Sequence, residues 1–196
     1  MKTLLNCLVL LIGLTTMGMA SATTSTGSVL YKSKDAKKFV LNTASLKADQ
    51  VNFRIIDQTG GIIYSDEINT SSIEARLFDM SRQPNGSYTV EIEDATRVTT
   101  YEVSLNQNDI QIEGNPSVDF KPVFRMTDDH TVGFNYLSLG KNATVRLANE
   151  NETIFDETLL GETSIERQYR LKNMKPGNYT LTVIVDGKAY YQSIDL

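Results

Sequence analysis

The sequence contains a single histidine, His130, which follows Asp128 and Asp129. Nucleophilic catalysis by a Ser-His-Asp or Cys-His set needs a histidine as base, so His130 is the one candidate. No G-x-S-x-G motif, which would place a serine nucleophile on a sharp turn, accompanies it. One histidine beside two adjacent acids is also a weak metal-binding pattern. We therefore interpret these residues as a solvated loop, and we predict no catalytic residue, no cofactor site and no metal site.

Two pairs of adjacent carboxylates, Asp66-Glu67 and Asp156-Glu157, occur at similar places in the two halves of the sequence. Two convergent carboxylates perform the acid, base and nucleophile steps of glycosidases. Neighbouring residues on a strand point to opposite faces, so we expect neither pair to converge on one substrate. Glu91 and Glu93 share a face, but it is the outward face of a predicted strand, where charges protect a sheet against edge pairing.

The segment Asn149-Glu150-Asn151-Glu152 is rich in side-chain oxygens and is the other candidate for a cation site. Calcium loops space their Asp and Asn ligands at alternate positions around a central glycine. This segment has neither the spacing nor the glycine. We interpret it as a surface turn.

Tyr190 and Tyr191 are the one adjacent aromatic pair in a chain that has no tryptophan. On a strand their rings must point to opposite faces, so we expect one of them to be exposed. A sandwich that binds sugars usually presents exposed aromatic rings. We therefore predict Tyr190 and Tyr191 as the surface for a ligand or partner, either a protein or a glycan; an interdomain contact explains the pair equally well.

The charge balance limits the class of partner. The chain has 19 Lys and Arg against 24 Asp and Glu, a net charge of −5. No basic patch with interleaved aromatic residues is visible, which argues against a nucleic acid as partner. Mild acidity mainly favours solubility.

Residues 1–22 have the pattern of a secretory signal peptide. Lys2 precedes a leucine-rich apolar run, and Ala20–Ala22 is an A-x-A cleavage site. The run is too short to span a bilayer comfortably, and no later run is long enough. We expect cleavage after Ala22 and export to the periplasm, the cell surface or the medium. Cys7 would be removed with the leader, so no disulfide would hold the fold, which favours a bacterial product.

Short segments of alternating hydrophobicity make up the rest of the sequence. Within Gly86–Asp94, for example, Tyr88, Val90 and Ile92 alternate with polar residues, as in a strand with one buried face. Asp186-Gly187 is typical of a two-residue hairpin turn. The predicted strands are Val29–Lys32, Lys38–Asn42, Val51–Asp57, Ile62–Ile68, Glu74–Asp79, Gly86–Asp94, Val98–Leu105, Val118–Phe124, Val132–Tyr136, Ala143–Ala148, Thr153–Leu159, Glu166–Leu171, Gly177–Val185 and Lys188–Leu196.

The two halves of the sequence follow the same plan. Gly86-x-Tyr88 recurs as Gly177-x-Tyr179, and Met80 aligns with Met174. A repeat of about 90 residues indicates two globular domains rather than a solenoid. About seven short strands per repeat is the size of an immunoglobulin-like sandwich.

We therefore predict an all-β fold of two tandem immunoglobulin-like β-sandwich domains after the signal peptide. Domain 1 covers residues 23–107 and domain 2 covers residues 116–196. Residues 108–115 are polar and are predicted to be a linker, although Ile110 and Ile112 could extend the preceding strand.

Tyr88 and Tyr179 begin corresponding strands and lie on their inward faces. A tyrosine at this position can bury its ring and donate its hydroxyl to the backbone of the preceding corner, which is the tyrosine corner of sandwich domains. The alternative is that the two rings form a binding platform.

The first domain resembles a known family. The segment Phe53–Tyr64, with Asp57 and Gly60 at its turn, is followed by Phe78-Asp79-Met80 and Pro84–Val90. This pattern resembles the C-terminal sorting domains of the type IX (Por) secretion system of Bacteroidetes, which combine an I-x-D-x-x-G-x-x-V turn with L-x-x-G-x-Y-x-x-x-V. The resemblance implies a seven-stranded sandwich and a role in addressing a cargo to the outer-membrane translocon.

The second domain departs from this pattern. Asn149–Glu152 replaces the Asp-x-x-Gly turn, and the sequence ends Ser193–Leu196 without a basic residue. We consider two functions. The main one is an exported, non-enzymatic protein that acts by surface interaction with a protein, a glycan or the cell envelope. The alternative is a type IX secretion cargo whose C-terminal domain is a sorting signal.

Overall fold

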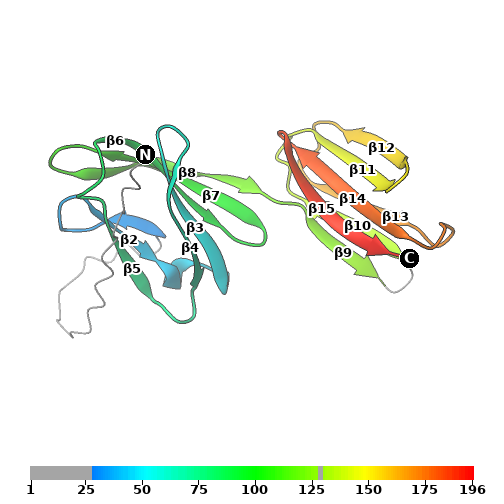
Figure 1. The fold of residues 1–196 in the computed structure, drawn as a ribbon, viewed down its shortest axis with the longest axis horizontal. Coiled ribbons are helices and arrows are strands. Elements are labelled where there is room, and N and C mark those ends of the chain that lie inside the picture. The colour runs from blue at the N-terminus through cyan, green and yellow to red at the C-terminus, as the bar shows by residue number, and fades with distance from the viewer. Residues whose placement is uncertain (1–27, 128–129) are drawn as a thin grey trace, which may run out of the picture. The chain divides into compact units, whose positions relative to one another are not determined.

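The computed structural model describes residues 28–127 and 130–196. The predicted signal peptide, residues 1–22, lies outside the described residues, as do Asp128 and Asp129. The described strands (Figure 1) are β1 Leu30–Lys32, β2 Lys38–Asn42, β3 Gln50–Asp57, β4 Ile62–Asn69, β5 Ala75–Asp79, β6 Gly86–Glu93, β7 Arg97–Leu105, β8 Ile110–Phe120, β9 Val123–Thr127, β10 Thr131–Tyr136, β11 Ala143–Asn149, β12 Thr153–Leu159, β13 Ile165–Arg170, β14 Asn178–Val185 and β15 Lys188–Asp195. A short 3₁₀ helix, Thr43–Ser45, follows β2.

The strands form two sandwiches with the same sheet order. The first combines the sheet β1-β2-β5 with the sheet β4-β3-β6-β7-β8, and the second combines β13-β10-β9 with β12-β11-β14-β15. Strands β9 to β15 repeat the arrangement of β1 to β7, and β8 is an addition at the edge of the first large sheet. The predicted all-β fold of tandem immunoglobulin-like sandwiches is confirmed.

The first sandwich is centred on three stacked aromatic rings. Phe78 lies between Phe39 and Phe53 in a nearly parallel stack, with ring centroids 4.5 Å apart for Phe53–Phe78 and 5.1 Å for Phe39–Phe78. Tyr64 packs edge-on against Phe53 and Phe78. Successive side chains on β3 point to opposite faces of the sheet, so Phe53 points inward while the residues on either side of it point outward.

The second sandwich has a mainly aliphatic core that also contains Phe134. Val145, Leu181 and Val183 are fully buried at its centre. They lie on β11 and β14, which pair with Val145 opposite Val183 and Leu147 opposite Leu181. As predicted, β6 and β14 bury alternate residues, namely Tyr88, Val90, Ile92, Tyr179, Leu181, Val183 and Val185.

The segment between the two repeats differs from the prediction. Residues 110–115, assigned to the linker 108–115 in the sequence analysis, belong to β8, which neighbours β7. Ile110 is completely buried and holds the start of β8 against the first sandwich, because an apolar side chain gains from leaving water. The single strand predicted for residues 118–124 is split at Lys121-Pro122, since proline has no N–H for a sheet ladder.

The described chain divides into two compact units. One contains the residues up to Val90 together with Tyr101–Asn115, and the other contains Glu91–Thr100 together with Pro116–Leu196. Within the residues described, no helix is long and apolar enough to cross a bilayer.

The predicted hairpin turn at Asp186-Gly187 is present. Val185 pairs with Lys188, so the turn has two residues, and both have positive φ, 49° for Asp186 and 76° for Gly187. This conformation suits the twist of the flanking strands β14 and β15.

Candidate functional site

The turn between β3 and β4 is built on one carboxylate. Oδ1 of Asp57 accepts hydrogen bonds from the Thr59 hydroxyl (2.6 Å), the Thr59 amide (2.8 Å) and the Gly61 amide (2.9 Å). These hydrogen bonds, the one from the Thr59 hydroxyl first, hold the pKa of Asp57 below its usual range. Gly60 has a φ of 85°, a left-handed conformation that favours glycine. Both fixed positions of the Asp-x-x-Gly pattern therefore have a structural role: Asp57 accepts the hydrogen bonds of the turn, and Gly60 adopts the left-handed conformation.

The Gly-x-Tyr pattern at the start of β6 meets this turn. The Tyr88 hydroxyl donates to the carbonyl oxygen of Pro84 over 2.6 Å, which confirms the predicted tyrosine corner. Gly86 has a φ of 155°, and a Cβ placed on it would lie 3.0 Å from Oε1 of Gln58. The Gln58 side chain of the first turn thus rests against Gly86 of the second. We call Asp57–Gly61 with Pro84–Tyr88 the first motif corner.

The second sandwich repeats this corner with different chemistry. Oδ1 of Asn149 accepts from the Asn151 and Glu152 amides, both over 2.8 Å, in place of Asp57. The Tyr179 hydroxyl donates to the carbonyl oxygen of Lys175 over 2.9 Å, the second predicted tyrosine corner. We call Asn149–Glu152 with Lys175–Tyr179 the second motif corner.

An open polar groove of about 410 Å³ is lined by the second motif corner. Among the described residues no side chain lies as close to Gly177 as Gln58 lies to Gly86, since the nearest atom to a Cβ there is a Tyr179 ring carbon at 4.0 Å. Oδ1 of Asn149 is engaged by two backbone hydrogen bonds in this groove. Among the residues that the structure describes, no group of three His, Cys, Asp or Glu side chains could hold a metal ion.

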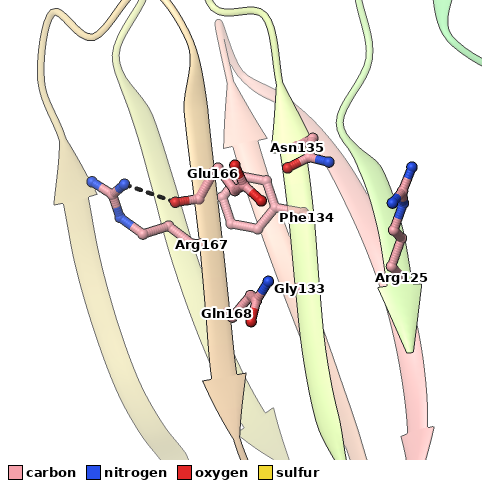
Figure 2. Close-up of a pocket in the computed structure, with 7 residues that line it drawn as sticks. All are labelled: Arg125, Gly133, Phe134, Asn135, Glu166, Arg167 and Gln168. Carbon is pink, nitrogen blue, oxygen red and sulfur yellow. Dashed lines mark hydrogen bonds between the residues drawn. The ribbon is translucent and has the colours of Figure 1, made fainter. Parts of the chain in front are cut away.

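A second hollow lies on the sheet β13-β10-β9 (Figure 2). Gly133 of β10 lines it, flanked in the strand register by Arg125 of β9 and Gln168 of β13. A Cβ on Gly133 would lie 2.9 Å from the carbonyl oxygen of Arg167, so the close approach of the two strands requires glycine. The hollow has a volume of about 60 Å³, room for a few water molecules. It is too small to enclose a sugar ring.

Arg167, one of the charged residues around this hollow, is already engaged. The guanidinium of Arg167 donates to the carbonyl oxygen of Glu166 over 3.0 Å (Figure 2). It also forms an ion pair with Glu162 at 2.5 Å. The sequence analysis did not single out Gly133. An isolated glycine inside a strand pattern is the signal that indicates a close backbone approach.

His130 occupies a turn position with a counterpart in the first sandwich. Its φ is 56°, and its carbonyl oxygen accepts from the Leu171 amide over 2.8 Å. Lys37 has a φ of 57°, and its carbonyl oxygen accepts from the Met80 amide over 2.9 Å. The two sandwiches thus share the backbone conformation at this turn position, although the residue is His130 in one and Lys37 in the other. His130 is exposed, as expected for a loop residue.

The paired carboxylates do not converge. On β4, Asp66 lies opposite the buried Phe53 whereas Glu67 lies opposite the exposed Asn52, so the two point to different faces. The Arg76 guanidinium holds Asp66 at 2.5 Å, and this contact is the main reason why the pKa of Asp66 is lowered.

The corresponding pair in the second sandwich also diverges, but in the reverse order: Asp156 lies opposite the exposed Arg146, and Glu157 lies opposite the buried Val145. Asp156 is paired with Arg146 at 2.6 Å, and Glu157 accepts a hydrogen bond from the Tyr169 hydroxyl. Burial, followed by the hydrogen bond to Glu157, raises the pKa of Tyr169. Each carboxylate is therefore held by a local partner.

Tyr190 and Tyr191 lie on β15 and face opposite ways. Tyr191 is 66% exposed and lies opposite Thr182 of β14, on the outer face of the sheet. Tyr190 lies opposite the fully buried Val183 and is half-buried, and burial is the main cause of its raised pKa. One exposed ring remains available as a contact surface.

A family model matches part of the chain. Residues 35–106 match the family described as "Secretion system C-terminal sorting domain". The match covers the first motif corner and confirms the resemblance stated from the sequence. It links the first sandwich to a family of secretion domains.

The solved structures that are similar to the chain share little sequence with it. A biofilm-associated protein, BSP domain, is 17% identical over 86% of this chain and 29% of that chain, with a TM-score of 0.27. A two-domain fibronectin type-III segment of chicken tenascin is 10% identical over 85% of this chain and 97% of that chain, with a TM-score of 0.30. This chain thus spans less than a third of the BSP-domain chain. No curated protein matches the chain significantly.

Proposed function

We propose that this chain is a cargo of the type IX secretion route and that its first sandwich is the sorting-type domain. The observation that carries the proposal is the family match over residues 35–106. The first motif corner supports it. The two halves of the family pattern, Asp57–Gly61 and Pro84–Tyr88, meet where Gln58 rests against Gly86. A translocon that recognises a folded domain needs a fixed and accessible feature of this kind to bind.

In this proposal the first sandwich, rather than the second, carries the recognised feature. Both corners keep the tyrosine hydrogen bond, but only the first has the Asp57 turn with glycine at the left-handed position. The second corner replaces Asp57 with Asn149 and has an open groove where the first is filled by Gln58. The two corners therefore present different surfaces.

We further propose that the exported protein is not an enzyme and acts by surface contact with a protein, a glycan or the cell envelope. Three observations support this. The carboxylate pairs are held by local partners such as Arg76 and Arg146. The hollow at Gly133 has room for only a few water molecules. The exposed ring of Tyr191 offers apolar area on a polar surface.

The proposal is tested by expressing the full chain in a bacterium with a type IX translocon and in a translocon-deficient strain. Protease accessibility and intact mass are measured in periplasm, outer membrane and medium. We expect the protein at the surface or in the medium of the first strain, and retention in the periplasm of the second. Equal export by both strains would contradict the proposal.

Variants of the full chain then identify the recognised sandwich. Asp57→Ala alters the first motif corner, and Asn149→Ala is the matched change in the second. We expect only the first variant to accumulate in the periplasm. Thermal unfolding of both purified variants is the control, because misfolding alone also blocks export. Intact mass shows in addition whether the second sandwich is removed during export.

A further inference from the structure

The two sandwiches differ at one edge of their larger sheets. The strands β7 and β15 are equivalent, because each follows the tyrosine-corner strand in the sheet order. In the first sandwich, β7 has a further neighbour, β8, on its outer side. In the second, β15 is the last strand of the sheet as described, beside β14 (Figure 1). The first repeat therefore shows what this edge can accept, namely one more extended strand.

The composition of β15 leaves this edge unprotected. An exposed edge presents unpaired backbone N–H and C=O groups, and proteins usually protect it with charges, proline or short length. The six residues Ala189–Ile194 contain no charge, no proline and no glycine, and the strand has eight residues. Charges lie only at its ends, in Lys188 and Asp195.

The other outermost strands carry such protection. Strand β1 has three residues. Strands β4, β5, β9, β12 and β13 each have a charged residue within the strand, and β8 has a proline. Among the edges that the structure describes, β15 is thus the one suited to pairing.

We propose that β15 is a self-association site, where β15 of a second copy pairs antiparallel across a twofold axis. A strand that meets its own copy across such an axis is complementary by symmetry, because residue i faces j and j faces i. The antiparallel arrangement also places the basic Lys188 end of one strand beside the acidic Asp195 end of the other, twice in each dimer. Parallel pairing would bring like charges together.

The exposed side chains of β15 fit this arrangement. Ala189, Tyr191 and Ser193 share the outer face, where Tyr191 lies opposite Thr182 and Ser193 opposite Thr180 in the existing ladder. The two tyrosine rings would lie close to the twofold axis. Cross-strand aromatic pairs stabilise antiparallel sheets, so the ring that is 66% exposed in one copy gains a partner.

The experiment is sedimentation velocity of the chain lacking only residues 1–22, over a wide concentration series. We expect a reversible monomer–dimer equilibrium. Tyr191→Lys and Ser193→Lys each place a charge within the edge at an exposed position, so each should shift the chain to monomer. Leu160→Lys is the matched control, since it replaces another exposed apolar residue away from β15 and should leave the dimer intact.

A chain that is monomeric at every concentration would overturn the proposal. A dimer that survives in both folded lysine variants would also overturn it, and would place the interface elsewhere. If a lysine variant unfolds, hydrogen exchange of the unaltered chain decides whether β15 is the paired strand. The amides of Ala189–Ile194 should become more protected as concentration rises, whereas those of the edge strand β12 should not. Equal behaviour of β12 and β15 would exclude pairing at β15.

Discussion

The Tyr88 hydroxyl lies 2.6 Å from the carbonyl oxygen of Pro84, four residues earlier in the chain. This hydrogen bond satisfies a partly buried carbonyl group and fixes the corner that leads into β6. Tyr88→Phe keeps the buried ring and removes only the donor, so it should lower the free energy of unfolding by about 1 kcal/mol.

Chemical denaturation measures this loss, and the matched change Tyr191→Phe is the control. The Tyr191 side chain is 66% exposed, so the loss of its hydroxyl should have almost no effect. If both variants lost the same stability, the corner hydrogen bond would have no stabilising role.

Gly86→Ala and Gly177→Ala test the two motif corners against each other. Both glycines have a φ that other residues rarely adopt, 155° and 153°. Alanine should therefore lower the free energy of unfolding by about 1–3 kcal/mol at either position. Gly86→Ala should cost more, because its Cβ also meets Oε1 of Gln58 at 3.0 Å. Unfolding free energies of the two variants measure the difference.

The role of Gln58 in that difference can be isolated. In a Gln58→Ala background the contact is absent, so Gly86→Ala and Gly177→Ala should then cost the same. A difference that persists without the Gln58 side chain would mean that backbone strain, and not the contact, distinguishes the corners.

Gly133→Ala should destabilise the second sandwich by about 1–3 kcal/mol, the usual cost of forcing extra volume into a packed site. The added Cβ would lie 2.9 Å from the carbonyl oxygen of Arg167, which is backbone and cannot turn aside. Asn135→Ala, at an exposed position on the same strand, is the control and should change stability by less than about 0.5 kcal/mol. Thermal unfolding compares the two variants.

Acid should destabilise the protein through the carboxylates that are held by hydrogen bonds and ion pairs. The contact with Arg76 lowers the pKa of Asp66, and the hydrogen bond from the Thr59 hydroxyl lowers that of Asp57. A pKa that is lower in the folded state means that the unfolded chain binds the proton more readily. The stability they provide is therefore complete above an unfolded pKa of about 3.9 and is lost as pH falls through the folded values.

Unfolding free energies measured from neutral pH to below about pH 4 check this dependence. Asp66→Asn should be less stable at neutral pH and should show a smaller loss on acidification than the unaltered chain. Parallel curves for the two proteins would show that Asp66 contributes nothing to the acid response.

Local patterns predicted much of the fold. Alternation of apolar residues located the central strands, because a strand with one buried face repeats every two residues. The Asp186-Gly187 turn and both tyrosine corners were also predicted, since each depends on the geometry of a few adjacent residues. The family pattern around Asp57 is local in the same sense.

Features that depend on contacts between distant strands were not predictable in this way. The addition of β8 to the first sheet depends on the burial of Ile110, and the sequence pattern indicated a strand there only as the alternative to a linker. The alignment of Met80 with Met174 is wrong, because the amide of Met80 binds the Lys37 carbonyl whereas the equivalent amide is that of Leu171. The hollow at Gly133 likewise exists only through the neighbouring strand β13.

Strand β1 gives the first sandwich a defined mechanical weak point. It pairs with β2 through three residues, Leu30 to Lys32, whereas β9, its equivalent, pairs with β10 through five. The Lys32 ion pair with Asp109 fastens the end of β1 to the loop after β7. A pulling force applied through the residues before Leu30 would act first on β1, which is held by its short ladder with β2, by the buried Leu30 side chain and by one salt-sensitive contact, and the β3–β6 centre of the large sheet would remain intact.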